Sequence, residues 1–277
     1  MPRKSSNLLK RRLKIAELVG QQGEIKVEDL SVLLGVSGVT IRGDLSYLEQ
    51  QGYLKRSFGG AIATPTFPQT SILPESGFSQ QPLTLSHKLE IAHHCARMVS
   101  DRETVFLGHG EISRRVIPFL GGVKKLRLIV NDLQHALLAE QFIEGDIIIA
   151  GDELIRSQSL LSGKALDDVI HKFTINHCIF EASIHDSTGS LIINQPLLTS
   201  HYQRCLDKAN NTTAIVTYFP EQPGPVTSLG NLSQVKNLVA SRYINEHYQQ
   251  LFSDSDFNIR YSNNECFTWS NRNLSGE

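Results

Sequence analysis

The chain has 277 residues, 40% of them hydrophobic and 20% charged, and this length and composition fit one small and one medium globular domain. No apolar run approaches the roughly 20 residues of a membrane span, and the basic N-terminus lacks the apolar core of a signal peptide, so we expect neither a membrane-spanning nor a secreted protein. The formal net charge is −1, but residues 1–62 hold 10 Lys and Arg against 6 Asp and Glu, so we expect only this basic segment to meet a polyanion.

The first predicted domain, residues 1–62, begins with the pattern of a helix-turn-helix. Residues 8–19 place an apolar stripe opposite Lys and Arg, which indicates a helix. Residues 27–34 repeat the pattern, with Leu33 among the apolar positions, and stop at Gly35. Ser37 can then cap a third helix by accepting hydrogen bonds from the amides of its first turn. Two short helices joined by such a turn predict a helix-turn-helix.

The third predicted helix has one apolar face and one small, polar face. Its apolar positions are Ile41, Leu45 and Leu48, at spacings of four and three residues. A small, polar face suits entry into a DNA major groove, which is about 12 Å wide. A turn of 100° per residue places Val39, Gly43, Ser46 and Tyr47 on this face, with Thr40 and Arg42 on its flanks.

A basic hairpin is predicted directly after this helix, because residues 53–61, YLKRSFGGA, alternate apolar and basic side chains and contain Gly-Gly. Its two cations suit contacts with phosphates beside the groove. The alternative is a three-helix module for protein interaction or dimerisation. The candidate DNA-binding residues are Ser37, Val39, Thr40, Arg42, Gly43, Ser46, Tyr47, Lys55 and Arg56.

Residues 40–45, Thr-Ile-Arg-Gly-Asp-Leu, resemble the signature of the DeoR-type family of bacterial transcriptional regulators. The likeness continues through Leu48, the Glu-x-x-Gly of residues 49–52 and the basic hairpin. It implies an α+β winged helix-turn-helix domain that binds a double-stranded DNA operator. The family usually has Lys, Arg or Asn where this chain has Gly43, and glycine inside a helix costs about 1 kcal/mol relative to alanine.

Residues 63–83 are predicted to be a linker, because residues 64–82 hold four of the ten prolines and show no regular period. The second predicted domain is residues 84–262, and residues 263–277 are predicted to be a polar, disordered tail. Within the second domain, apolar runs alternate with helical patterns, which predicts an α/β domain with a mainly parallel, Rossmann-like sheet. The apolar runs are residues 104–108, 126–130, 146–151, 177–182 and 213–218, with a further strand near residues 257–261.

Ligands of such sheets bind beyond the carboxyl ends of the strands. The positions to consider are therefore residues 108–113, 131–132, 151–163 and 181–189. By its resemblance to the same family, this domain is similar to sugar-phosphate isomerases and is expected to sense an effector. Arg156 with Ser159 could hold an anion, and the alternative is an ordinary turn with a solvated Arg. The candidate effector-binding residues are His109, Gly110, Glu111, Asn131, Asp132, Gly151, Arg156 and Ser159.

Several loops depart from the family pattern. The usual Asp-x-Gly-Thr-Thr loop is replaced by residues 108–113, with a carboxylate at Glu111, and the usual Asp-Ser-Ser-Lys is replaced by residues 218–222. The acidic residue and the lysine expected near residues 197–205 are also absent. We therefore expect simple phosphorylated sugars to bind poorly, and a neutral or cationic polyol or amino sugar to fit better.

The cysteines and histidines give no sign of a metal site or a disulfide framework. Four widely spaced cysteines without a C-x-x-C pair argue for a reducing compartment, so we expect a cytoplasmic protein. The adjacent residues 93–95, His-His-Cys, lie on one helix and cannot all face one ion. We expect no metal, no cofactor and no catalytic residues.

The sequence thus predicts a DNA-binding transcriptional regulator, with repression expected and activation left open, of a carbohydrate or related metabolic operon. Because such regulators pair two half-sites, we expect a homodimer or homotetramer. One alternative is a regulator that has lost its response to an effector. The other is an enzyme of the sugar-phosphate isomerase type that carries a DNA-binding appendage.

Overall fold

The computed structural model of the chain describes residues 11–12, 14–16, 18–19, 22–50, 54–63, 83, 85–217, 227–263 and 266–274. The chain forms two compact units, Met1–Ser86 and His87–Glu277. Apart from its end residues 63 and 83, the predicted linker lies outside the described residues. Within the described ranges, no helix combines the length and the apolar character that crossing a membrane requires.

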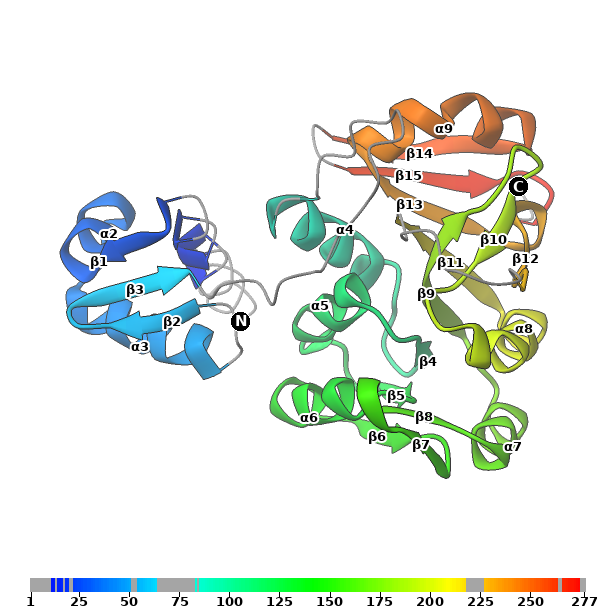
Figure 1. The fold of residues 1–277 in the computed structure, drawn as a ribbon, viewed down its shortest axis with the longest axis horizontal. Coiled ribbons are helices and arrows are strands. Elements are labelled where there is room, and N and C mark those ends of the chain that lie inside the picture. The colour runs from blue at the N-terminus through cyan, green and yellow to red at the C-terminus, as the bar shows by residue number, and fades with distance from the viewer. Residues whose placement is uncertain are drawn as a thin grey trace. The chain divides into compact units, whose positions relative to one another are not determined.

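The first unit is a small winged helix-turn-helix (Figure 1). After helical residues between positions 11 and 22, the strands form an antiparallel sheet in the order β1-β3-β2. Its own apolar cluster, which includes Ile15, Leu30, Ile41 and Leu54, closes the core of this unit. The elements are β1 (Glu24–Lys26), α2 (Val27–Leu34), α3 (Gly38–Gln50), β2 (Leu54–Ser57) and β3 (Gly60–Ala63).

The turn between α2 and α3 is built as the sequence predicts. Helix α2 ends at Gly35, whose φ of 63° is the left-handed conformation that favours glycine. The amide of Thr40 then donates to the Ser37 hydroxyl at 3.2 Å, which caps α3. Of the predicted apolar positions in α2, Val27 and Leu30 are buried, but Leu33 is 59% exposed, so this detail of the prediction is wrong.

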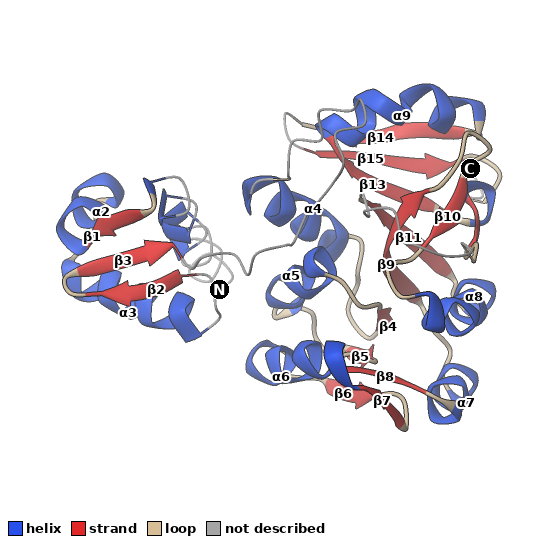
Figure 2. Cartoon of the chain, in the orientation of Figure 1, coloured by secondary structure: helices blue, strands red, loops and turns tan. Residues whose placement is uncertain are grey.

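The second unit is an α/β domain, and its boundary with the first falls in the first turn of helix α4 (Leu85–Arg97). Helices α4, α5 and α6 lie on one side of its sheet and α7 and α8 on the other (Figure 2). The remaining elements are β4 (Thr104–Leu107), α5 (Glu111–Leu120), β5 (Arg127–Val130), α6 (Leu133–Phe142), β6 (Asp146–Ile149), β7 (Glu153–Ile155), β8 (Leu160–Ser162), α7 (Lys164–Lys172), β9 (His177–Ile184), β10 (Ser190–Ile192), α8 (Thr199–Lys208), β11 (Asn211–Val216), β12 (Gly230–Asn231), β13 (Asn237–Ser241), α9 (Arg242–Asp254), β14 (Phe257–Ser262) and β15 (Cys266–Asn271).

The main sheet has the order β14-β15-β13-β11-β9-β4-β5-β6, and all neighbours from β13 to β6 are parallel. The predicted mainly parallel sheet is therefore confirmed. From β4 the chain proceeds outward through β5 to β6, whereas from β9 it proceeds the other way through β11 to β13. The strand order thus reverses between β4 and β9, and ligands of open α/β sheets bind in the crevice at such a point.

The predicted disordered tail of residues 263–277 is wrong for most of its length. Strand β15 pairs antiparallel with both β13 and β14, and it buries Cys266 and Trp269. Four of its six residues are buried, namely Cys266, Thr268, Trp269 and Asn271, and two of these are polar, so the strand carries no continuous apolar run.

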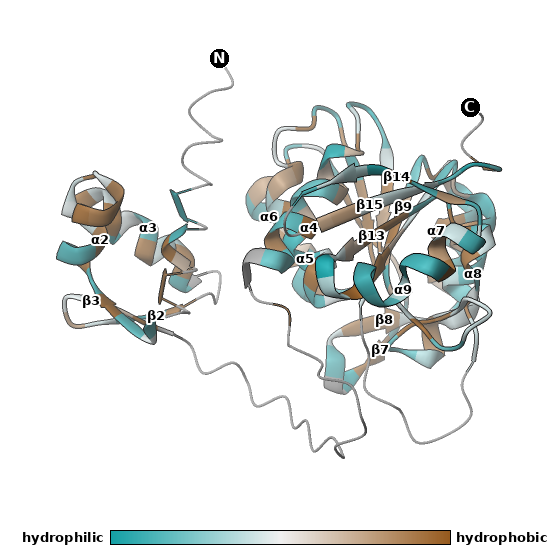
Figure 3. Cartoon of the chain, turned by 90° about the horizontal axis from the view of Figure 1, so that it is seen from above, coloured by the Kyte–Doolittle hydropathy of each residue, from teal (hydrophilic) through white to brown (hydrophobic). Residues whose placement is uncertain are grey.

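The core of this unit lies between the sheet and its helices. Strand β9 is buried along its whole length, since helices cover both of its faces. Coloured by hydropathy, the middle of β13 is apolar, whereas much of α9 is hydrophilic (Figure 3).

Candidate functional site

Helix α3 presents an exposed face of small and polar side chains. Val39 is 76% exposed, and Arg42 and Gly43 are exposed beside it. Ser37, exposed, and Thr40, half-buried, lie at the start of the helix, where their hydroxyl oxygens are 2.9 Å apart. The structure therefore brings these predicted DNA-binding residues together on one surface, without a bulky side chain at Gly43.

The hairpin β2–β3 is fixed to this helix by Arg56. The Arg56 amide donates to Glu49 Oε1 at 2.8 Å, and its guanidinium donates to the Ser46 hydroxyl at 2.9 Å. Lys55 remains exposed. Phe58, which the sequence analysis did not single out, is fully exposed at the tip of the hairpin.

Tyr47 does not lie where we expected it. The Arg12 guanidinium stacks 3.7 Å from the centre of its ring, and the ring packs against the core of the first unit. Asp44, three residues before Tyr47, is 2% exposed and accepts from the Nε atoms of Arg11 at 2.6 Å and Arg12 at 2.9 Å. Both residues therefore fasten the first helical segment to α3.

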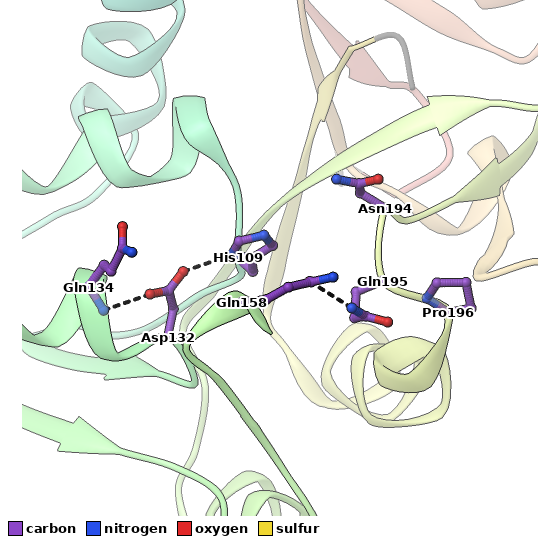
Figure 4. A pocket seen from close by; sticks show the side chains of 7 residues that line it. All are labelled: His109, Asp132, Gln134, Gln158, Asn194, Gln195 and Pro196. Carbon is purple, nitrogen blue, oxygen red and sulfur yellow. Dashed lines mark hydrogen bonds and ion pairs between the residues drawn. The ribbon is translucent and has the colours of Figure 1, made fainter. Parts of the chain in front are cut away.

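A polar cavity of about 470 Å³ lies beyond the carboxyl ends of strands β4 and β5 (Figure 4). His109 follows β4, and its Nδ1 lies 2.7 Å from Oδ2 of Asp132, which follows β5. Across the cavity, Gln195 Nε2 donates to Gln158 Oε1 at 2.6 Å. Four of the lining side chains are amides, and none of those described is Lys or Arg. The lining residues are His109, Asp132, Gln134, Gln158, Asn194, Gln195 and Pro196.

The N-terminus of α5, at the point where the strand order reverses, is occupied by a buried carboxyl group of the chain itself. Glu181 on β9 is 8% exposed, and its Oε1 accepts from the amides of Ile112 at 2.6 Å and Ser113 at 2.7 Å. Burial raises the pKa of Glu181, although the two amides oppose this shift. A β-carbon at Gly110 would collide with the same carboxyl group, so glycine is required there.

Glu111, predicted to face the ligand, is engaged elsewhere. Lys88 Nζ lies 2.6 Å and Arg115 Nη2 3.1 Å from its carboxylate oxygens. Burial by itself raises the pKa of Glu111, but the charges of Arg115 and Lys88 outweigh it, and the pKa lies below its ordinary value. Glu111 is therefore neutralised locally and does not line the cavity.

His135 completes a cluster with His109 and Asp132. Its Nε2 lies 3.6 Å from Asp132 Oδ2 and 3.2 Å from the carbonyl oxygen of Gly110. Burial lowers the pKa of His135 to about 4, so the ring is neutral at pH 7. For Asp132, burial opposes ionisation, but the hydrogen bond from His109 and the neighbouring His135 outweigh it and lower the pKa.

The other predicted effector-binding residues do not line the cavity, and most of them have a structural role instead. Asn131 is fully buried, donates to the carbonyl of Leu161 at 3.0 Å and accepts from the Tyr202 hydroxyl at 3.3 Å. Gly151 allows close approach of β8, and Ser159 adopts a left-handed conformation at φ 57°. Arg156 is exposed and is not among the residues that line the cavity.

His135, Tyr202 and the amides at positions 134, 194 and 195 were not predicted, whereas Glu181 and the amide at position 158 lie in the ranges considered but were not among the candidate residues. One signal was present for Glu181, which is the lone charged residue inside the apolar run of residues 177–182. The amides come from separate loops and carry no sequence pattern, so only the fold brings them together.

Two family models match the chain. The one described as a DeoR-like helix-turn-helix domain matches residues 11–66, and the one described as a DeoR C terminal sensor domain matches residues 84–241.

Similar proteins cover most of the chain as well. The glycerol-3-phosphate regulon repressor of Haemophilus influenzae is 30% identical over 230 residues, which span 82% of this chain and 87% of that protein. The HTH-type transcriptional regulator IolR of Bacillus subtilis is 21% identical and spans 91% of this chain and 98% of that protein. Among solved structures, ribose 5-phosphate isomerase A of Methanocaldococcus jannaschii is 14% identical with a TM-score of 0.36, covering 67% of this chain and 78% of that one.

Proposed function

The chain belongs to the DeoR family of DNA-binding transcriptional regulators, and we propose that it represses an operon of carbohydrate or related metabolism under the control of a small, neutral polar effector. The names of its relatives support a regulator rather than an enzyme. They include a repressor of a glycerol-3-phosphate regulon.

The observation that carries this proposal is the exposed face of α3 beside the basic hairpin. A helix that leaves Val39, Arg42 and Gly43 exposed can approach base edges in the major groove. Lys55 on the adjoining hairpin is exposed for contact with a phosphate. Asp44, a carboxylate of the same helix, is buried beneath two arginines.

The class of effector is inferred from the groups that line the cavity. A phosphate needs charge-assisted donors or the free amides of a helix N-terminus. Here no Lys or Arg is among the described lining residues, and Glu181 already accepts from the first amides of α5. Side-chain amides both donate and accept hydrogen bonds, which suits the hydroxyl groups of a polyol or an unmodified sugar.

The deciding experiment is genome-wide mapping of the DNA sites that the full-length protein occupies, because the adjoining genes identify the pathway. Titrations of a mapped operator then test effectors in two classes, neutral polyols and their phosphorylated forms. We expect a polyol of the pathway to weaken operator binding and its phosphate ester to have no effect. Release by the phosphate ester alone would contradict the proposed effector class, and failure to bind any mapped site would contradict the DNA-binding proposal.

A regulator without an effector is the second candidate, since Glu181 fills a position that a ligand anion could take. It predicts that no compound of either class changes the melting temperature or the operator affinity. Replacement of Glu181 by Ala gives a control: opening the α5 amides should create phosphate binding that the native protein lacks.

A further inference from the structure

Three side chains with metal-binding atoms meet at the edge of the cavity. His109 follows β4, Asp132 follows β5, and His135 lies in the first turn of α6. Their ligand atoms all lie within 4.8 Å of one another. We propose that His109, Asp132 and His135 bind a divalent transition-metal ion such as Zn²⁺.

The chemistry of this set favours such an ion. Two imidazoles with one carboxylate bind Zn²⁺ and neighbouring transition metals, whereas Mg²⁺ and Ca²⁺ prefer oxygen ligands alone. Bonds of about 2.0–2.2 Å place adjacent ligand atoms roughly 3–3.5 Å apart. The separation of 3.6 Å between Asp132 Oδ2 and His135 Nε2 is close to that value, and the 2.7 Å between His109 Nδ1 and Asp132 Oδ2 needs only a small opening.

The three side chains are held in place by the fold. Asp132 Oδ1 accepts from the amides of Gln134 at 2.7 Å and His135 at 3.2 Å, which caps α6 and leaves Oδ2 directed at the two histidines. The side chains of Asp132 and His135 are 5% and 1% exposed, so their orientation is fixed by packing. His109 is 27% exposed at the cavity wall, and an ion bound there would direct its remaining coordination positions into the cavity.

The hydrogen bonding of His135 leaves room for a cation between its Nε2 and Asp132 Oδ2. Its Nε2 faces both the Gly110 carbonyl and Asp132 Oδ2, but a single proton on Nε2 can serve only one of these oxygens. An ion would contact the nitrogen and the carboxylate together. Its Nδ1 is buried without a hydrogen-bond partner in the described structure, and a ligating histidine that lacks such a partner binds roughly 10–100-fold more weakly. We therefore expect reversible binding, weaker than in a closed structural zinc site.

Such an ion could also ligate hydroxyl groups of the effector, and this consequence alone rests on the proposed function. The metal site is therefore tested without an effector. The test measures Zn²⁺ binding to the full-length, untagged protein by calorimetry, after treatment with a chelator. Visible absorption of bound Co²⁺ reports the ligand set in a parallel experiment. We expect one saturable site per chain for both ions.

Two variants and one control decide the assignment. His109→Ala removes a ligand at the cavity wall, and Asp132→Asn removes a charge while retaining an oxygen that can cap α6. Each should weaken Zn²⁺ binding at least tenfold and change the Co²⁺ spectrum. His201→Ala is the control, because His201 Nδ1 lies 2.6 Å from Asp167 with no third metal-binding side chain grouped beside them in the described residues.

The proposal is wrong if the native protein shows no saturable site, or if the control weakens binding as much as the two variants do. Circular dichroism spectra and thermal unfolding of each variant confirm that it is folded. Operator binding is measured separately from metal binding. A protein that binds Zn²⁺ but no operator would therefore contradict the proposed function and leave the metal site intact.

Discussion

At the scale of single residues, substitutions at Gly43 test the stability of α3 and its contact with DNA separately. A β-carbon built at Gly43 meets nothing within 4 Å, so the free protein does not need glycine there. Because glycine inside a helix costs about 1 kcal/mol relative to alanine, we predict that Gly43→Ala stabilises the first unit by about that amount. Urea denaturation of a fragment of residues 1–63, whose core is closed within itself, measures the change.

The same position tests how closely the helix approaches DNA. If Gly43 is only a lost phosphate or base contact, Gly43→Lys should tighten operator binding, and this is the result we expect. A folded Gly43→Lys protein that no longer binds its operator would show that the backbone itself must approach the bases.

Arg42 and Lys55 should contribute to DNA binding in different ways. Arg42→Ala should weaken operator binding by roughly 1–3 kcal/mol and binding to random DNA much less, if the side chain reads a base edge. Lys55→Ala should weaken both kinds of DNA alike and flatten the salt dependence by about one unit of slope. Titrations at several salt concentrations measure both effects. If Arg42→Ala weakens binding to operator and to random DNA equally, Arg42 contacts a phosphate and not a base edge.

His177 should make the second unit sensitive to acid. It is 2% exposed, its Nε2 lies 2.8 Å from the Thr213 hydroxyl, and burial lowers its pKa from 6.5 to about 4. Below pH 6.5 the unfolded chain therefore binds a proton that the folded chain does not, and stability falls until the pH reaches about 4. Between pH 6.5 and 4, protonation of His177 in the unfolded chain lowers the free energy of unfolding by about 3 kcal/mol, because each pKa unit corresponds to about 1.36 kcal/mol.

The test compares the native protein with His177→Gln, which keeps a partner for Thr213 but cannot be protonated. The single tryptophan of the chain, Trp269, is buried in the second unit, so its fluorescence follows the unfolding of that unit. We expect the native protein to lose stability more steeply than the variant between pH 6.5 and 4. Parallel curves would show that His177 does not titrate on unfolding in this range.

The role of a single residue could be predicted where its hydrogen-bond partner is close in sequence. It could not be predicted where the partner is distant in sequence. Ser37 caps α3 three residues away, as the sequence predicts. Asp44 is paired with arginines 32 and 33 positions away, and Glu181 with amides 68 and 69 positions away. Such pairs require the tertiary fold, and this is why Glu111 rather than Glu181 was expected to face the ligand.

At the scale of elements, strand β15 is an integral part of the sheet. It pairs with β13 and β14, and the Trp269 indole donates to Asn245 Oδ1 of α9 at 2.8 Å. We predict that deletion of residues 263–277 unfolds the second unit, because it exposes the apolar edge of β13. Within the intact chain, Trp269→Ala should cost about 3–5 kcal/mol.

Circular dichroism during thermal unfolding measures both changes. The matched control is Leu274→Ala just beyond the strand, where the side chain is 37% exposed and the cost should stay within about 0.5 kcal/mol. A truncated protein with the native melting temperature would show that the strand contributes nothing to stability.

The predictable elements were those with a continuous apolar sequence. Strands β4, β5, β6, β9 and β11 all coincide with predicted apolar runs. Helices bury β4, β5, β9 and β11 on both faces, whereas β6, at the edge of the sheet, has no buried residue. The strands β13 and β15 and the hairpin β7–β8 were missed. They are short or carry polar side chains on one face, and their pairing with distant strands is what defines them.

At the scale of the whole molecule, two self-contained cores divide the work between DNA and effector. The first unit closes its core without residues of the second, and the second places its cavity where the strand order reverses. The division into two units could be predicted from the sequence, because composition and hydrophobic periodicity extend over long stretches of the chain. The nature of the effector depends on a few side chains gathered from separate loops, so the sequence alone suggests its class only by charge.

Assembly is the remaining property of the whole molecule, and it follows from the size of the DNA-binding unit. One helix-turn-helix with a short hairpin covers a single half-site, and regulators of this kind pair half-sites about one DNA turn apart through a symmetric dimer. No heptad seam is present in residues 1–62, so association must come from the larger unit. We predict that the full chain and a fragment of residues 84–277 are dimers or tetramers, whereas residues 1–63 are monomeric. Light scattering with size-exclusion chromatography at micromolar concentration measures this, and a monomeric fragment of residues 84–277 would contradict it.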